Sequence, residues 1–143
     1  CASLNLEVYT MTSEAAAQSE IREAAAYIGI TLSRNKSGVL PNPNGRPVRF
    51  GLANDEPNLN ARVKSSDLIG WHEPSGRFVS IEVKAPGWRG PRTDRELAQQ
   101  RWIDAVRRAG GIAGFATCVG DLYAILLDDA VNGARVGPVE QGD

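Results

Sequence analysis

Two runs decide the fold of this chain, Asp67-Leu-Ile-Gly-Trp71 and Arg77-Phe-Val-Ser-Ile-Glu-Val-Lys84, and the break Glu73-Pro-Ser-Gly76 separates them. We interpret both runs as strands that pair as a hairpin across this break. Successive side chains of a strand point to opposite faces, so Glu82 and Lys84 share one face while the alternate apolar residues take the other. Two charged side chains are therefore expected together at one strand end.

The hairpin pairing would bring a third charged residue, Asp67, beside Glu82 and Lys84. Hard divalent cations such as Mg²⁺ take oxygen ligands and keep several waters, and a lysine beside them can activate a water or neutralise a phosphoryl oxygen. Two carboxylates with one ammonium are thus typical of a metal-dependent phosphodiesterase. A cross-strand ion pair on a solvated face would use the same residue types, so these three residues alone leave both interpretations open.

Further motifs occur in order along the chain: Ser33-Arg-Asn-Lys-Ser-Gly38, Gly45-Arg-Pro-Val-Arg-Phe-Gly51, Ser65-Ser-Asp-Leu-Ile-Gly70, Ile81-Glu-Val-Lys84, Gln99-Gln-Arg-Trp-Ile103 and Ala109-Gly-Gly111. Their order and spacing resemble the VRR-Nuc domain, the virus-type replication-repair nuclease branch of the PD-(D/E)xK superfamily. The resemblance spans about residues 13 to 127 and extends to small free-standing members that resolve Holliday junctions. It implies an α/β fold with a restriction-endonuclease-like core, in which helices flank a mixed central sheet.

The resemblance also implies roles for individual residues. Asp67 and Glu82 are expected to bind Mg²⁺ or Mn²⁺ together with the backbone carbonyl of Val83, and Lys84 is the expected catalytic lysine that serves the attacking water. A glutamine on the next helix and a glutamate on the first helix complete the site of the family.

Two adjacent glutamines compete for the first of these roles. Gln99 lies three residues before Trp102 and seven before Val106, on the apolar helix face that turns toward the sheet. Gln100 lines up with Asp104 toward solvent. We therefore prefer Gln99 as the site residue.

The candidate for the helix glutamate is Glu14. It belongs to a stripe with steps of three or four residues, the spacing of one face of an amphipathic helix: Glu14, Gln18, Ile21, Ala25 and Ile28. The alternative is that Glu14, in the first turn after Ser13, only complements the helix dipole. The sequence leaves both possibilities open.

The net charge of −1 gives no indication of a nucleic-acid partner, but the distribution of charge does. Residues 34–92 hold ten Lys or Arg against five Asp or Glu, a net charge of +5, whereas the remainder holds six against twelve, a net charge of −6. A positive field around a metal site suits a polyanionic backbone. The candidate DNA contacts are Arg34, Lys36, Arg49, Lys64, Trp88, Arg89 and Arg92.

Trp88 lies between glycine and arginine in a loop that follows Lys84. An exposed tryptophan there could stack on an unpaired base or wedge at a branch point while the arginines hold phosphates. It could equally pack as a lid over the core, the more frequent environment of tryptophan.

We expect a single domain over 13–127, with an N-terminal extension over 1–12 and a polar C-terminal tail over 128–143. Within the domain, the patterns predict helices over about 13–28, 93–109 and 121–127, and extended segments at 30–33 with 39–40, 48–51, 67–71, 78–84 and 112–119. No apolar run approaches the ~20 residues of a membrane span. The first ten residues also lack the basic start and apolar centre of a signal peptide, so we expect a cytoplasmic protein of bacterial or phage origin that acts on DNA.

The leading hypothesis is a metal-dependent endodeoxyribonuclease that cuts four-way junctions. Two symmetric cuts require two sites, hence a homodimer. The alternatives are a module that binds branched or single-stranded nucleic acid without cutting, and a restriction-type endonuclease that cuts duplex DNA.

Overall fold

The computed structural model describes residues 13–135. The expected extension 1–12 and the last part of the expected tail, 136–143, lie outside the described residues. Along the chain the elements are α2 (Glu14–Tyr27), β1 (Ile30–Arg34), β2 (Gly38–Pro41), β3 (Pro47–Phe50), α3 (Pro57–Arg62), β4 (Leu68–His72), β5 (Phe78–Val83), α4 (Asp94–Arg108), β6 (Ile112–Ala116) and α5 (Val119–Arg135).

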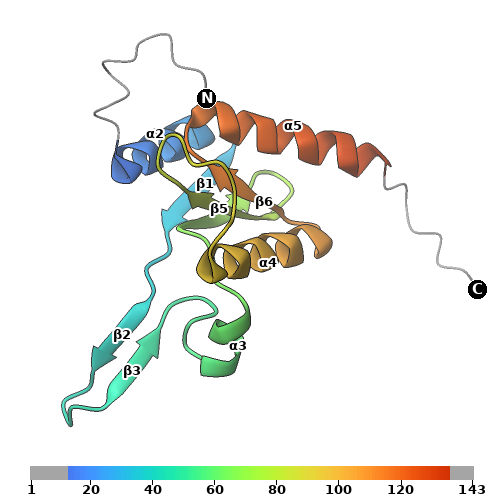
Figure 1. Ribbon diagram of the computed structural model, residues 1–143. Coiled ribbons are helices and arrows are strands. Elements are labelled where there is room, and N and C mark those ends of the chain that lie inside the picture. The colour runs from blue at the N-terminus through green and yellow to red at the C-terminus, as the bar shows by residue number, and fades with distance from the viewer. Residues whose placement is uncertain (1–12, 136–143) are drawn as a thin grey trace, which may run out of the picture.

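The central sheet has four strands in the order β1-β4-β5-β6. β1, β4 and β5 are antiparallel neighbours, and β6 pairs parallel to β5. The helix α4 provides the crossover that a parallel pair requires. Helices α2 and α5 cover one face of the sheet and α4 covers the other (Figure 1). The expected mixed sheet flanked by helices is confirmed.

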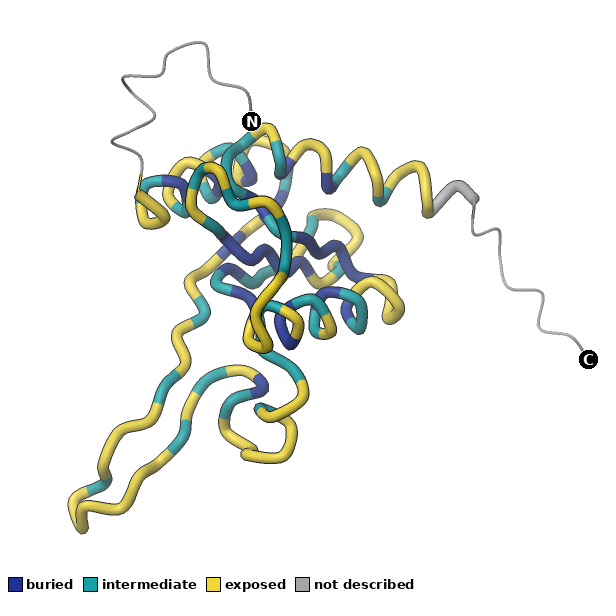
Figure 2. The backbone as a smooth tube through the Cα atoms, in the orientation of Figure 1, coloured by how far each residue is buried: buried dark blue, intermediate teal, exposed yellow. Residues whose placement is uncertain are grey.

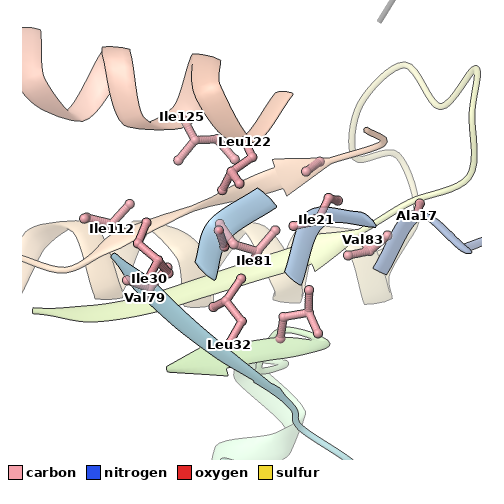
Figure 3. Packing of buried hydrophobic residues seen from close by; sticks show 13 residues of the cluster. Ala17, Ile21, Ile30, Leu32, Val79, Ile81, Val83, Ile112, Leu122 and Ile125 are labelled. Atoms are coloured by element: carbon pink, nitrogen blue, oxygen red, sulfur yellow. The ribbon is translucent and has the colours of Figure 1, made fainter. Parts of the chain in front are cut away.

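The hairpin expected from the sequence is present. β4 and β5 pair antiparallel with Leu68 opposite Ile81, a register that places Asp67 level with Glu82 at the open end of the hairpin. Ile81 is fully buried in the apolar core between the sheet and the helices α2 and α5 (Figure 3). Alternation along β5 therefore directs Glu82 to the other face, toward α4.

The strands β2 and β3 form a separate two-stranded sheet that projects from the body of the molecule (Figure 1). The sequence pattern had suggested that β1 and β2 belong to one extended segment. This two-stranded sheet, the β2–β3 arm, is mostly exposed. The buried residues concentrate in the central sheet and the helices that cover it (Figure 2).

Two helices differ from the expectation. Residues Pro57–Arg62, where the sequence patterns predict neither helix nor strand, form α3, which begins with proline in its first turn and with the Glu56 carboxylate accepting from the amides of Asn58 and Leu59. α5 continues to Arg135 rather than ending near residue 127, so residues 128–135 of the expected tail are helical.

The longer α5 is held by a contact that the local pattern does not reveal. Arg77, at the start of β5, forms a bidentate ion pair with Asp129, with nitrogen to oxygen distances of 2.9 and 2.7 Å. This fork geometry ties the second half of α5 to the hairpin.

Candidate active site

The two carboxylates lie at the open end of the β4–β5 hairpin, and each accepts a hydrogen bond from a backbone amide of the opposite strand end. The Asp67 amide donates to Glu82 Oε2 at 3.0 Å, and the Val83 amide donates to Asp67 Oδ2 at 3.1 Å. Because the N–H and C=O of a strand residue point to the same side, the Val83 carbonyl faces the edge on which Asp67 lies. The three expected metal ligands are thus brought together by strand register.

The loop before Asp67 is fixed by Asn35, which follows β1. The Asn35 amide donates to the Asp67 carbonyl at 2.7 Å, and its side-chain nitrogen donates to the Ser66 carbonyl at 2.9 Å. Asn35 falls within a family motif, but its positioning role is not legible from sequence because it depends on a contact more than thirty residues away.

The environment of Glu82 opposes its ionisation. Its exposed fraction is only 4%. Burial, followed by the nearby charge of Asp67, raises the pKa of Glu82 to about 8, although Lys84 acts in the opposite direction. An additional positive charge beside Glu82 would therefore stabilise its ionised form.

The helix α4 contributes Gln99, whose exposed fraction is 3%. Its Nε2 donates to Glu82 Oε1 at 2.8 Å, and its Oε1 accepts from Lys84 Nζ at 2.8 Å. Gln100 instead donates to Asp104 on the more open side of the helix. The structure therefore places Gln99, and not Gln100, between the glutamate and the lysine.

Lys84 has two carboxylates within 4 Å. Its Nζ lies 3.7 Å from Glu82 Oε1 and 3.9 Å from Glu96 Oε2. Glu96 also completes the capping box of α4 with Thr93 and accepts from Trp88 Nε1. The hydrogen bond from Trp88, with those from the Thr93 region, lowers the pKa of Glu96 to about 2. Glu96 is not among the site residues predicted from the sequence, because its proximity to Lys84 depends on how α4 packs beside the end of β5.

Trp88 packs in the manner of a lid. Its ring centroid lies 4.6 Å from that of Phe115 on β6, and Lys84 Nζ lies 5.8 Å from the Trp88 centroid. Both rings remain half-buried. The sequence leaves open whether Trp88 packs over the core or stacks on DNA. These contacts show that it packs against Phe115, and a contact between Trp88 and DNA stays a prediction.

A polar pocket of about 40 Å³ opens beside the carboxylates, lined by residues that include Asp67, Glu82, Ser66, Lys64 and Arg95. Ser66 Oγ is buried there without a hydrogen-bond partner among the described residues. Burial, and then the charges of Arg95 and Arg49, lower the pKa of Lys64.

This pocket therefore combines cations with the two carboxylates. Arg95 was missed by the sequence reasoning, although it lies four residues before Gln99 and so on the same helix face.

The other expected DNA contacts lie on several segments of the chain. Arg34 and Lys36 are exposed near the junction of the central sheet and the β2–β3 arm, and Arg89 and Arg92 are exposed on the loop before α4. Arg49 is half-buried and donates to Asn54.

Glu14 is exposed at the start of α2 and has no side-chain hydrogen bond or ion pair within residues 13–135. Ala17, one turn further along, packs in the core near Val83 (Figure 3). Glu14 thus lies at the correct end of the sheet but does not contact the carboxylates.

The residues at the hairpin end fit a hard divalent cation. Among residues 13–135 no group of three or more His, Cys, Asp or Glu could hold a metal ion. Mg²⁺, however, needs only one or two carboxylates because it keeps several waters. Asp67, Glu82 and Ser66, whose Oγ has no partner among the described residues, line a polar pocket, and together with the Val83 carbonyl they would offer a cation oxygen ligands only.

A comparison with protein families supports this interpretation. The VRR-NUC domain matches residues 42–120, more than half of the chain and a range that includes Asp67, Glu82, Lys84 and Gln99. The chain belongs to the VRR-NUC family. Membership of the VRR-NUC family implies a nuclease of the PD-(D/E)xK type, with DNA as its substrate, and enzymes of this type typically use divalent metals.

No curated protein and no solved structure matches this VRR-NUC chain. Within the described part of the chain, no helix has the length and apolar character needed to cross a membrane.

Proposed function

We propose that this protein is a Mg²⁺- or Mn²⁺-dependent endodeoxyribonuclease that cuts branched DNA at four-way (Holliday) junctions. The observation that carries the catalytic part is the connected group Asp67, Glu82, Gln99 and Lys84. Lys84 donates to Gln99, and Gln99 and the Asp67 amide donate to Glu82, while the Asp67 carboxylate accepts from the neighbouring Val83 amide, all within 3.1 Å. An ordinary solvated ion pair would not be buried in this manner.

Each residue has a distinct task in the proposed reaction. Asp67, Glu82 and the Val83 carbonyl would hold the cation, which when bound activates a water and polarises the phosphoryl oxygen. Lys84 presents its ammonium protons to the attacking water or the phosphoryl oxygen. Gln99 acts as a positioning residue, because it holds Lys84 Nζ against the Glu82 carboxylate.

The cations near the site supply the attraction for the DNA backbone. Lys64 and Arg95 line the same pocket as the carboxylates, Arg34 and Lys36 are exposed on either side of the pocket residue Asn35, and Arg89 is exposed on the loop that follows Lys84. Such contacts orient the duplex but carry no sequence information. This arrangement suits recognition of DNA shape, which supports a branched substrate over readout of a duplex sequence.

We further propose that the active form is a homodimer, because two symmetric cuts need two sites related by a two-fold axis. The β2–β3 arm exposes apolar side chains suited to an interface, among them Val39 at 47%, Leu40 at 61% and Val48 at 49%. Light scattering at micromolar protein should give the dimer mass. A monomer mass both alone and on junction DNA would refute the dimer and favour cutting of flap-type substrates.

A single gel tests the substrate. Labelled four-way junction, flap, single strand and duplex are each incubated with protein, with and without Mg²⁺ or Mn²⁺. We expect cutting of the junction in the presence of metal and little cutting of duplex. Equal cutting of duplex would support the restriction-type alternative, and binding without cutting of any substrate would support the non-cleaving module.

A further inference from the structure

A second hollow lies at the end of β6, the strand that pairs with β5 on the side away from β4. Its volume is about 450 Å³, and its lining comes from the loop after β5, the end of β6 and the start of α5: Pro86, Gly87, Trp88, Arg89, Phe115 and Asp121, among others. Lys84 Nζ lies 5.8 Å from the Trp88 centroid and 6.0 Å from the Phe115 centroid. The hollow is therefore next to the proposed catalytic lysine.

Two aromatic rings form the wall of this hollow. Trp88 and Phe115 are tilted by 38° to each other and are both half-buried, so part of their surface is left open. The hydrogen bond from Trp88 Nε1 to Glu96 fixes the orientation of the indole. A rigid aromatic surface of this kind stacks on any nucleobase, because every base has a π-face.

The polar part of the hollow is an oriented carboxylate. The amide and the Oγ1 of Thr117 both donate to Asp121 Oδ2, at 2.8 and 2.7 Å. The other oxygen, Asp121 Oδ1, receives no hydrogen bond from the described residues. Asp121 is a lining residue of the hollow, so a carboxylate that Thr117 holds in place keeps one acceptor oxygen without a partner among the described residues.

We propose that this hollow binds one unpaired nucleobase of the DNA, next to the phosphate that is cut, and that it prefers bases with an exocyclic amino group. The proposal rests on the proposed function, since the neighbouring Lys84 is taken to act on that phosphate. Strands are about 4.8 Å apart in a sheet, so a site at the end of β6 is within one nucleotide of the end of β5. Asp121 Oδ1 accepts from an amino group, whereas the one donor on the pairing edge of thymine, the ring N3–H, lies between two carbonyl oxygens that a carboxylate repels.

The test uses the Asp67→Asn variant to prevent cutting. Fluorescence anisotropy measures its Kd for labelled branched DNA with one unpaired cytosine or one unpaired thymine at the branch. We expect cytosine to bind about five-fold more tightly, the ratio that corresponds to one net hydrogen bond of about 1 kcal/mol.

Substitution of Asp121 by Asn in this background should remove or reverse the preference. The amide oxygen can still accept from Thr117, but an NH₂ donor takes the place of the free Oδ1. The matched control is Asp128→Asn, the same change on an exposed residue of α5 outside the lining of this hollow, and it should keep the preference. As a second variant, Phe115→Leu should weaken binding of DNA with an unpaired base but not of fully paired duplex.

Equal affinity for the two bases in the parent protein, or an unchanged preference in Asp121→Asn, would overturn the proposal. Cutting of the same DNA by the wild-type protein with Mg²⁺ is scored separately. Cutting without a base preference would reject the base pocket alone, whereas a base preference without cutting by the wild type would reject the nuclease mechanism and retain the pocket.

Discussion

Replacing Glu82 by Gln should flatten the pH dependence of stability in the metal-free protein. The pKa of Glu82 is raised from an ordinary value of 4.5 to about 8, chiefly by burial. Between these values the native state holds a proton that the unfolded state releases. The stabilisation that accompanies the protonated form is therefore complete below pH 4.5 and is lost as the pH rises toward about 8.

The size of the effect follows from the shift. Each pH unit inside this window corresponds to about 1.4 kcal/mol, so the free energy of unfolding at pH 7 should fall by about 3 kcal/mol relative to that near pH 4.5. The Glu82→Gln variant lacks the titrating group and should lack this slope. Constant contributions, such as a changed hydrogen bond to Gln99, cancel because the slopes are compared and not the absolute stabilities.

Urea unfolding followed by tryptophan fluorescence measures the slope, first with EDTA and then with Mg²⁺ or Mn²⁺. A cation that binds ionised Glu82 should recover stability at neutral pH in the wild type, by about 2.7 kcal/mol at a hundred-fold excess over its Kd. The control Glu20→Gln changes an exposed residue of α2 and should keep the wild-type slope. A wild-type slope in Glu82→Gln would refute the reasoning, since Glu82 would then not be the titrating group.

Three further predictions concern the site and the core. Lys84→Ala should abolish turnover but leave Mn²⁺ affinity by calorimetry nearly unchanged, because the ammonium is no ligand; lost metal binding would make Lys84 structural. Gln99→Leu leaves Glu82 Oε1 and Lys84 Nζ without their shared partner, so cleavage should slow by about 10- to 100-fold in a single-turnover assay, and an unchanged rate would remove its positioning role. Ile81→Ala should lower the free energy of unfolding by about 2 to 5 kcal/mol in urea titrations, and a loss below 1 kcal/mol would contradict its place in the core.

The parts of the site that depend on local periodicity could be predicted from the sequence. Alternation along β5 places Glu82 opposite to Ile81, and the antiparallel register brings Asp67 level with Glu82. Helical periodicity along α4 turns Gln99 toward the sheet and Gln100 away from it. These relations hold because the strand repeat of two and the helix repeat of 3.6 residues determine which side chains share a face.

The parts that depend on long-range packing could not be predicted. Arg95 joins Lys64 in the polar pocket only because α4 packs beside the loop that precedes β4. The extension of α5 to Arg135 accompanies an ion pair between Arg77 and Asp129, which are far apart in sequence. Contacts of this kind leave no repeat in the sequence from which they could be inferred.

The environment of Trp88 is a related case. Its neighbours in sequence are compatible with an exposed stacking residue, but Phe115 comes from β6 and Glu96 from α4. The choice between a lid and a stacking surface depends on these two elements, and the structure shows a ring that packs against Phe115 and also lines a hollow.

Cleavage of a labelled four-way junction by the wild-type protein and the Asp67→Asn variant, in Mn²⁺ and in EDTA, tests the central claim most directly. The amide of the variant can still accept from the Val83 amide, so the fold should persist while a charge of the metal site is lost. We expect the wild type to cut only with Mn²⁺, and the variant to bind the junction but cut it slower by orders of magnitude. Cutting by the variant at the wild-type rate, or cutting by the wild type in EDTA, would contradict the account.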